Sequence, residues 1–254
     1  MSRPAAPPPP QAFAQLVACE ARLAWRNPRG LVVGIAFPVV MLVVFGELPH
    51  AQLHRLALGG LTRFDVEVPV LATLVIAALA LVSLPGPLAT YRQEGTLRRL
   101  ATTPAPRSWV LAAPVVINLG LALVGLIVVF LLGHVAFGLV IPRNPGALAL
   151  TLVLCISALF AIGLAIAAVA HVSGLQVISA AAFLPLVFFA GLWIPRQQMS
   201  SVLQHISDYT PLGAAVQACQ NAILGAFPPA RPLLVMGAYA LIFGAAAWRL
   251  FRWE

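Results

Sequence analysis

Long apolar runs separated by short polar segments dominate this chain. Six of the runs approach the roughly 20 residues that a helix needs to cross a bilayer. The pattern predicts an all-α integral membrane protein with six transmembrane helices, at about residues 30–47, 68–89, 110–133, 146–170, 176–194 and 233–250. The third run is the hardest to delimit, since its apolar residues continue past His134 to Ile141.

The N-terminal region has a different pattern from the spans. Residues 1–10 are rich in proline, which predicts a disordered lead-in. Residues 11–28 place apolar side chains on one side of a helix and arginines, among them Arg22 and Arg26, on the other. This is the pattern of an amphipathic helix that lies at the membrane interface. Residues 29–254 then form the six-span membrane domain.

Glu20 interrupts the apolar face of this interfacial helix. Two interpretations are open at this stage. The carboxylate bends away from the apolar face to reach water, or it forms an ion pair with an arginine of the segment 91–107.

The segment after the fifth run is too long for a simple turn. Beyond Trp193 and Pro195, two short apolar stripes at helical spacing stand on either side of Pro211. Two amphipathic helices broken by a proline predict a re-entrant helical hairpin on the outer side of the membrane. The hairpin either caps a pathway through the protein or packs as a lid on the outer ends of the spans.

Composition agrees with a membrane protein and narrows the chemistry. The chain is 61% hydrophobic and 9% charged, whereas soluble domains are roughly 45–50% apolar. All 15 basic residues are arginines. Without lysine the chain cannot form a Walker A loop, so we expect no nucleotide site and no catalytic residues. No metal-binding motif occurs, and the arginines flank the spans instead of gathering on one soluble face, which disfavours nucleic-acid binding.

The arginines also predict the orientation, because short arginine-rich loops stay on the cytoplasmic side. With both termini in the cytosol, ten arginines lie inside and five outside. The abundance of alanine, valine and leucine without lysine is typical of a GC-rich bacterial genome, so we expect a multi-pass protein of the bacterial inner membrane, surrounded by lipid. The inner arginines are Arg3, Arg22, Arg26, Arg29, Arg92, Arg98, Arg99, Arg107, Arg249 and Arg252, and the outer ones Arg55, Arg63, Arg143, Arg196 and Arg231.

Charged residues are missing from the middle of every predicted span. A charge retained there usually marks a proton or ion pathway, so a proton-coupled antiporter is not expected. Asn118 and Ser157 are the candidates for contact with a substrate inside the membrane. Their alternative role is ordinary hydrogen bonding between helices.

The most charged segment between two spans reads Glu94-Gly95-Thr96-Leu97-Arg98-Arg99-Leu100, with Arg92 before it and Thr103-Pro104 after it. It resembles the coupling-helix motif of type-2 ABC transporter permeases, approximately Arg-Glu-x-Gly-Thr-Leu-x-x-Leu followed by a proline. The resemblance extends to segments 188–195 and 208–212 and covers roughly residues 11–252. Arg92 departs from the motif, since Gln93 separates it from Glu94.

The resemblance implies a dimer, of identical or similar permease chains, that docks two separately encoded cytosolic ABC ATPase subunits. Those subunits would hold ATP and Mg²⁺, and this chain would hold no cofactor. Leu97 and Leu100 would insert into the ATPase, and Arg98 and Arg99 would pair with its acidic groups. Glu94 would cap the coupling helix or bind the N-terminal helix. The alternative is a solvated loop whose charges only fix the topology.

The expected function is that of the permease subunit of an ATP-driven exporter. The predicted pathway has neither a central charge nor a run of aromatic residues for stacking on sugars, which favours a hydrophobic or amphipathic substrate such as a drug-like metabolite or a lipid. Two alternatives stay open. One is an energy-independent channel or carrier, and the other is a non-transporting membrane anchor or assembly factor.

Overall fold

The computed structural model describes residues 10–26, 28–48, 62–93 and 107–250, and within these ranges the chain is helical and contains no strand. Residues 1–9 of the predicted lead-in and the predicted coupling segment 94–100 lie outside the described residues. The elements are α1 Pro10–Arg26, α2 Pro28–Leu31, the π-helical turn η1 Val32–Ala36, α3 Phe37–Gly46, α4 Arg63–Ala78, the π-helical turn η3 Leu79–Ser83, α5 Pro85–Gln93, α7 Arg107–Phe137, α8 Pro145–Val169, α9 Val172–Ala190, the 3₁₀ turn η4 Arg196–Gln198, α10 Ser201–Tyr209, α11 Pro211–Leu224 and α12 Ala230–Leu250.

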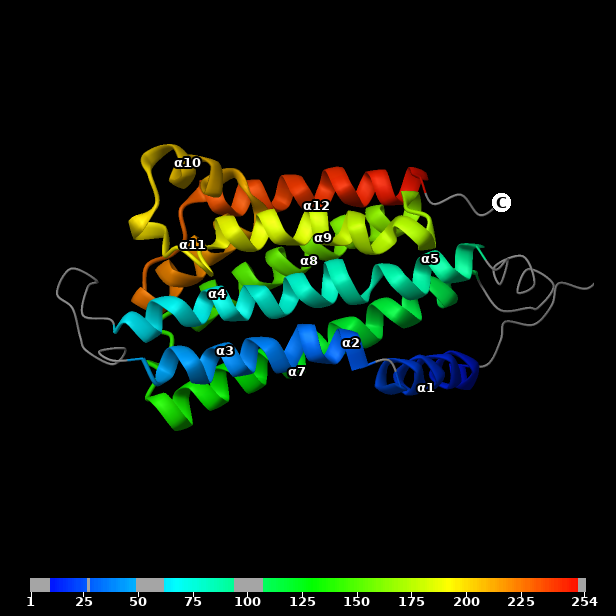
Figure 1. Cartoon of the computed structure of the whole chain (residues 1–254), viewed down its shortest axis with the longest axis horizontal. Helices are drawn as coiled ribbons and strands as arrows, with labels where there is room; N and C mark the ends of the chain where they lie inside the picture. Colours follow the sequence, from blue (N-terminus) through cyan, green and yellow to red (C-terminus); the bar gives the residue numbers. More distant parts are fainter. Residues whose placement is uncertain (1–9, 27, 49–61, 94–106, 251–254) are drawn as a thin grey trace, which may run out of the picture.

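The long helices run side by side along the length of the molecule (Figure 1). One end of the bundle carries α1, the end of α5 and the start of α7, and we call it the α1 end. The opposite end carries α10 and the start of α4, and we call it the α10 end.

Five helical stretches are long and apolar enough to cross a membrane, so the chain is a multi-pass membrane protein. They coincide with the second to sixth predicted spans, and they are Arg63–Gln93, Leu111–Phe137, Pro145–Val169, Val172–Ala190 and Ala230–Leu250. The first predicted span, 30–47, corresponds to a shorter apolar helix, Val32–Gly46. The count of six spans therefore stays a prediction.

The stretch formed by α4, η3 and α5 lies at the centre of the bundle, and all of its residues from 68 to 81 are buried. Its first turn is held by a capping box, in which Thr62 and Asp65 bond each other's backbone N–H groups. Asp65 is almost fully buried and also accepts a hydrogen bond of 3.1 Å from the backbone N–H of Val140. One carboxylate thus fixes the start of the central helix and ties it to the chain after α7.

The two π-helical turns lie next to each other, one in the central stretch and one in the helix before it. Gly34 of η1 allows this approach, because a Cβ there would lie 2.6 Å from the side chain of Leu79 in η3. On its other side η3 meets α8, where a Cβ on Gly163 would lie 2.0 Å from the carbonyl oxygen of Ala80. Single π turns inside α-helices are frequent at functional sites.

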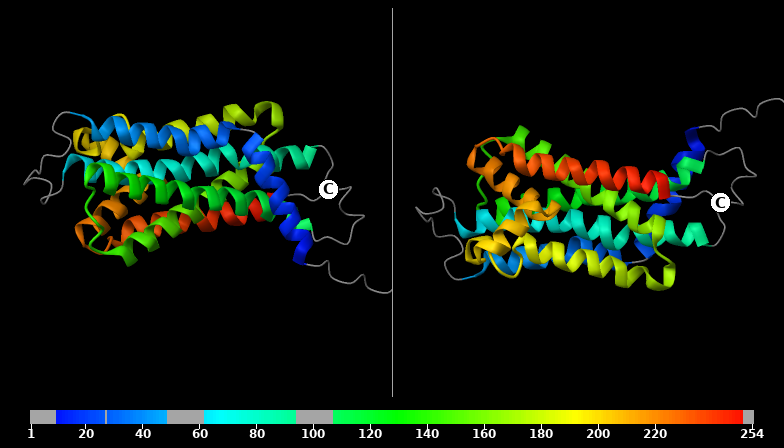
Figure 2. Two further views of the ribbon diagram at one scale, coloured as in Figure 1. Left: turned by 90° about the horizontal axis from the view of Figure 1, so that it is seen from below. Right: turned by 90° about the horizontal axis from the view of Figure 1, so that it is seen from above.

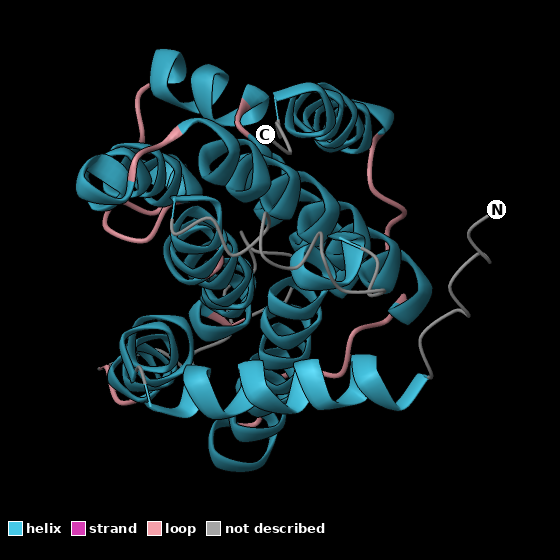
Figure 3. Ribbon diagram, turned by 90° about the vertical axis from the view of Figure 1, so that its right-hand side faces the viewer, coloured by secondary structure: helices cyan, strands magenta, loops and turns pink. Residues whose placement is uncertain are grey.

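The peripheral helices α7, α9 and α12 expose many apolar side chains, as lipid-facing or partner-facing helices do. Val177 on α9 and Leu241 on α12 are among the most exposed. By contrast, α1 lies across the α1 end of the bundle instead of continuing along it (Figures 2 and 3). It has the amphipathic pattern predicted for an interfacial helix, and its position at a membrane surface stays a prediction.

The two helices predicted on either side of Pro211 are α10 and α11. Ten of the 14 residues of α11 are buried, and the helix packs against α4, α8, α9 and α12. Helix α10 covers the same end of the bundle and exposes Val202 and Ile206. Re-entry of this hairpin into a membrane stays a prediction. Within the protein, α11 is part of the core.

Candidate functional site

Glu20 joins α1 to the end of the central stretch. Its side chain is only 6% exposed and accepts a hydrogen bond from the hydroxyl of Tyr91 on α5. Burial raises the pKa of the Glu20 carboxyl above its ordinary value, and the bond from Tyr91 partly opposes this rise. Among the described residues, the partner of Glu20 is the phenol of Tyr91. Most of the segment 91–107, including Arg98 and Arg99, lies outside the described residues, so the predicted ion pair stays a prediction.

Apolar contacts hold α1 in place around this bond. Leu16 packs against Ala168 of α8, as Tyr91 and Leu111 also do. Phe13 meets Trp109 edge to face with ring centroids 5.4 Å apart. The predicted polar side of α1 faces away, since Arg22 and Arg26 are exposed. Helix α1 is therefore fixed to α5 and α7 by its apolar face, with one buried acid in that face.

Arg92, which follows Tyr91, closes the end of another helix. Its guanidinium donates hydrogen bonds to the backbone carbonyls of Ala167, Ala168 and Ala170 at the end of α8, at 3.1 Å to the first and 2.6 Å to the last. The last carbonyls of a helix have no partner within it and carry partial negative charge. The guanidinium of Arg92 supplies these carbonyls with hydrogen-bond donors and with a positive charge. The coupling motif did not indicate this structural role.

The next residue, Gln93, is also held, because its side-chain amide lies 3.0 Å from Nδ1 of His171 at the start of α9. The predicted coupling residues Glu94, Gly95, Thr96, Leu97, Arg98, Arg99 and Leu100 lie outside the described residues. Their flanks are described, since α5 ends at Gln93 and α7 begins at Arg107, both at the α1 end (Figure 1).

A large cavity lies among these helices near the α1 end. Its volume is about 800 Å³, within the range of sites for drug-sized ligands. Its walls are mainly apolar and come from α1, α2, η1, η3, α5, α7 and α9, and its polar side chains are Glu20, Ser83, Thr90, Tyr91, Asn118, Gln176 and Ser179.

The two residues predicted to contact a substrate differ in position. Asn118 lines the cavity and is 5% exposed. Its Nδ2 donates to the carbonyl of Pro114 at 2.9 Å, and its Oδ1 has no partner within the described part of the chain. Ser157 is exposed on α8, bonds the carbonyl of Val153 in its own helix and does not line this cavity.

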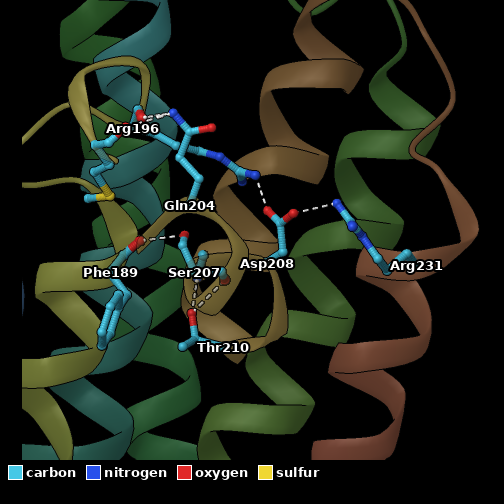
Figure 4. Close-up of polar contacts among 9 residues, drawn as sticks. Phe189, Arg196, Gln204, Ser207, Asp208, Thr210 and Arg231 are labelled. Atoms are coloured by element: carbon cyan, nitrogen blue, oxygen red, sulfur yellow. Dashed lines mark hydrogen bonds and ion pairs between the residues drawn. The ribbon is translucent and has the colours of Figure 1, made fainter. Parts of the chain in front are cut away.

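At the α10 end, Asp208 is the centre of an ion-pair cluster (Figure 4). It is 7% exposed and pairs with Arg196 of η4 on one oxygen and with Arg231 of α12 at 2.5 Å on the other. Burial lowers the pKa of the Arg196 guanidinium, and the charge of Arg231 lowers it further. One acid thus joins α10 to the chain on both sides of it.

Neutral hydrogen bonds complete this cluster (Figure 4). Ser207 Oγ donates to the carbonyl of Phe189 at 2.7 Å, which fixes α10 to the end of α9. Gln204 Nε2 donates to the carbonyls of Arg196 and Met199 at 3.1 and 3.0 Å. Of the predicted hairpin residues, Trp193 is exposed, Pro195 precedes η4, and Pro211 is the buried first residue of α11.

Sequence reasoning placed Arg196 and Arg231 on the outer side but did not connect them to Asp208, and it did not identify Tyr91 as a partner of Glu20. The scarcity of charge was the available signal. With only seven acidic residues in the chain, a buried one in an apolar segment requires a specific partner.

These features define a class of protein. A bundle of apolar helices, an amphipathic helix across one end and a drug-sized cavity beside it are the elements of a membrane-embedded transport component. A sequence model of the ABC-2 type transporter family matches residues 11–224, which is most of the chain, and the chain belongs to this family. Family membership makes it the transmembrane component of an ABC transporter and implies pairing with an ABC ATPase subunit. Comparison with curated protein sequences finds no match.

Proposed function

We propose that the chain is the permease subunit of an ATP-driven exporter that moves a hydrophobic or amphipathic molecule out of the cell. A separately encoded ATPase supplies the energy, since the lysine-free chain has no Walker A loop. The α1 end faces the cytosol, with both termini on that side, and the protein lies in the inner membrane of a bacterium. Two permease chains, identical or similar, form the transporter, and the exposed apolar faces of α9 and α12 support such pairing.

The observation that carries this proposal is the attachment of the chain just before the predicted coupling segment. Three consecutive residues of α5 contact three other helices, with Tyr91 bonded to α1, Arg92 to the end of α8, and Gln93 to the start of α9. A force applied to the residues that follow would therefore reach α1, α8 and α9 together. This is the mechanical requirement for converting closure of an ATPase into movement of the membrane helices.

The cavity supports the substrate class. Most of its lining is apolar, and a few side chains supply hydrogen-bonding groups. A site of this composition suits a molecule with a large apolar body and a small polar part. Drug-like metabolites and lipids have this construction.

The first test is co-purification of the tagged chain with the ATPase encoded beside its gene. We expect the double variant Leu97→Asp, Leu100→Asp to lose the ATPase while it still inserts into the membrane. A matched control, Leu48→Asp, Leu224→Asp, changes two exposed leucines at the α10 end and should keep the ATPase. Failure of the wild-type chain to capture this ATPase would favour an energy-independent channel or carrier.

The second test separates a transporter from an anchor or assembly factor. In proteoliposomes containing permease and ATPase, substrate should stimulate ATP turnover and accumulate on the side opposite the ATPase. Leu97→Asp and Glu94→Ala should each abolish that stimulation while leaving basal ATPase activity. An ATPase complex without stimulation by any amphipathic substrate would support the anchor interpretation.

A further inference from the structure

The cavity at the α1 end contains a buried acid for which the described residues supply no cationic partner. Glu20 is the one residue with an ionisable carboxyl or basic group among the described residues that line it. The described part of the chain gives Glu20 a single hydrogen-bond partner, the hydroxyl of Tyr91. A buried carboxylate is costly unless a cation or several donors accompany it. Asp208, at the other end of the bundle, has two arginines.

Another residue in the wall of this cavity, Asn118, has a buried acceptor without a donor among the described residues. Asn118 is 5% exposed, and its side-chain Nδ2 donates a hydrogen bond to the backbone carbonyl of Pro114 in its own helix. This leaves Oδ1 without a donor in the described part of the chain. A buried acceptor without a donor costs free energy that a ligand can recover. Both Glu20 and Asn118 therefore favour a ligand that donates hydrogen bonds.

The walls on either side are apolar and locally irregular. Val33 of η1 and Val82 of η3 both line the cavity, so each π-helical turn contributes to its wall. Helix α9 supplies Phe183 and Leu184 on another side. The cavity thus combines hydrogen-bond acceptors with apolar walls. The acceptors suit a polar group that donates hydrogen bonds, and the walls suit an apolar body of the same ligand.

We infer that this cavity binds an amphipathic amine, with the ammonium or amine N–H groups donated to Glu20 and Asn118 and the apolar body against η1, η3 and α9. The inference rests on the proposed function in one respect, namely that the cavity is taken as a substrate site of the exporter. The ligand's amine has two possible sources, a drug-like molecule or a lipid with an amine headgroup. Both present N–H donors on an apolar body, and the experiment distinguishes them.

The test measures binding of rhodamine 6G, a cationic amphiphile with N–H groups, to the purified full chain in phosphatidylcholine nanodiscs. Fluorescence polarisation gives the dissociation constant, with protein-free discs as the baseline. We expect Glu20→Gln to weaken binding about ten- to a hundredfold, the usual effect of losing a charge-assisted hydrogen bond. Glu47→Gln, which alters an exposed acid just after α3, is the matched control and should leave the affinity unchanged.

A second variant and a competitor complete the experiment. Ala180→Trp places a large side chain in the cavity from α9, where Ala180 is exposed and tolerant of change. We expect it to weaken rhodamine 6G at least as much as Glu20→Gln does. Phosphatidylethanolamine, which carries a primary amine, should compete with the dye if lipid is the natural occupant, and should not compete if a drug-like amine is.

Equal binding of the dye by wild type, Glu20→Gln and Ala180→Trp would overturn the inference, as would failure of the wild-type chain to bind it above the baseline. Neither result would affect the exporter proposal, because binding to the isolated permease requires no ATPase. Conversely, loss of ATPase capture with cation binding intact would remove the exporter proposal and leave the site.

Discussion

Among the described residues, each end of the bundle buries one acidic side chain outside the long spans, and the two acids are stabilised in different ways. Asp208 at the α10 end pairs with two arginines. Its neighbours Ser207 and Gln204 bond the backbone carbonyls of Phe189 and Arg196. Glu20 at the α1 end borders a large cavity, and its one partner in the described part of the chain is the phenol of Tyr91. The acid of the α10 end is therefore neutralised by ion pairs that fix the neighbouring helices. The acid of the α1 end lies in the wall of a cavity, where a ligand can bind it.

The largest expected effect is that of removing the central acid of the α10 end. Asp208→Ala leaves the guanidinium of Arg196 partly buried without an acid, and we expect the free energy of unfolding to fall by about 3 kcal/mol. Arg231→Ala is the matched control, because its side chain is 45% exposed and its loss should cost at most about 1 kcal/mol. Midpoints of thermal unfolding in detergent would show the difference. Equal losses for the two variants would contradict a lock centred on Asp208.

Glycine-to-alanine substitutions at Gly213 and Gly86 measure how closely each end of the bundle is packed. A Cβ on Gly213, in α11, would lie 2.3 Å from the carbonyl oxygen of Ser207, so Gly213→Ala must displace backbone and should cost about 1–3 kcal/mol. Gly86 borders the cavity, and in the described part of the chain no atom beyond its own turn lies within 4 Å of such a Cβ. Gly86→Ala should therefore be neutral or stabilise by up to about 1 kcal/mol. The same unfolding assay checks both, and a clear loss for Gly86→Ala would contradict the open packing of the α1 end.

Substitution of Arg92 tests whether this residue stabilises the fold of the α1 end or binds the ATPase. We expect Arg92→Gln to lower the free energy of unfolding by about 1–2 kcal/mol, because the carbonyls that end α8 lose their charged donor. Arg249→Gln, an exposed change in the last turn of α12, should have little effect. Below its melting temperature the Arg92 variant should still capture the ATPase. Loss of capture with unchanged stability would instead assign Arg92 to docking.

The smallest expected effect is at Glu20, and it depends on pH. Because the pKa of this carboxyl is raised above 4.5 in the folded protein, the native state binds the proton more tightly than the unfolded state. Wild-type stability therefore declines as the pH rises from about 4.5 through the raised pKa and then levels off. Glu20→Gln lacks this decline, so its melting temperature should equal that of wild type near pH 4 and exceed it near pH 8. If the melting temperatures of wild type and Glu20→Gln changed with pH in the same way, burial of Glu20 would not destabilise the protein, and the contrast between Glu20 and Asp208 would be wrong.

Sequence alone predicted the helices well and their long-range partners poorly. Apolar runs and the break at Pro211 are local signals, and the predicted helices are present in the described ranges. The partner of Glu20 lies 71 residues away on another helix, and the carbonyls bound by Arg92 lie 75 to 78 residues away. No local pattern encodes such pairings, which depend on how the helices pack.

The helix α11 shows the same limit in its burial. Its apolar stripe, including Leu212 and Val216, predicted an amphipathic helix, yet its small residues Ala214 and Ala218 are equally buried because four helices surround it. Alanine is compatible with either environment, so the sequence could not distinguish a surface lid from a core helix. The coupling residues remain a prediction carried by their motif.

The π-helical turn η3 has a consequence for insertions and deletions. Such a turn accommodates one more residue than an α-turn, and each residue of an α-helix accounts for about 100° of rotation. Deleting one residue within Leu79–Ser83 would therefore convert the turn to an ordinary α-turn and leave the flanking side chains in their directions, with Tyr91 toward α1 and Arg92 toward α8. The same deletion earlier in α4 would rotate the two parts of the helix against each other. Length variation among relatives should accordingly be concentrated at this turn.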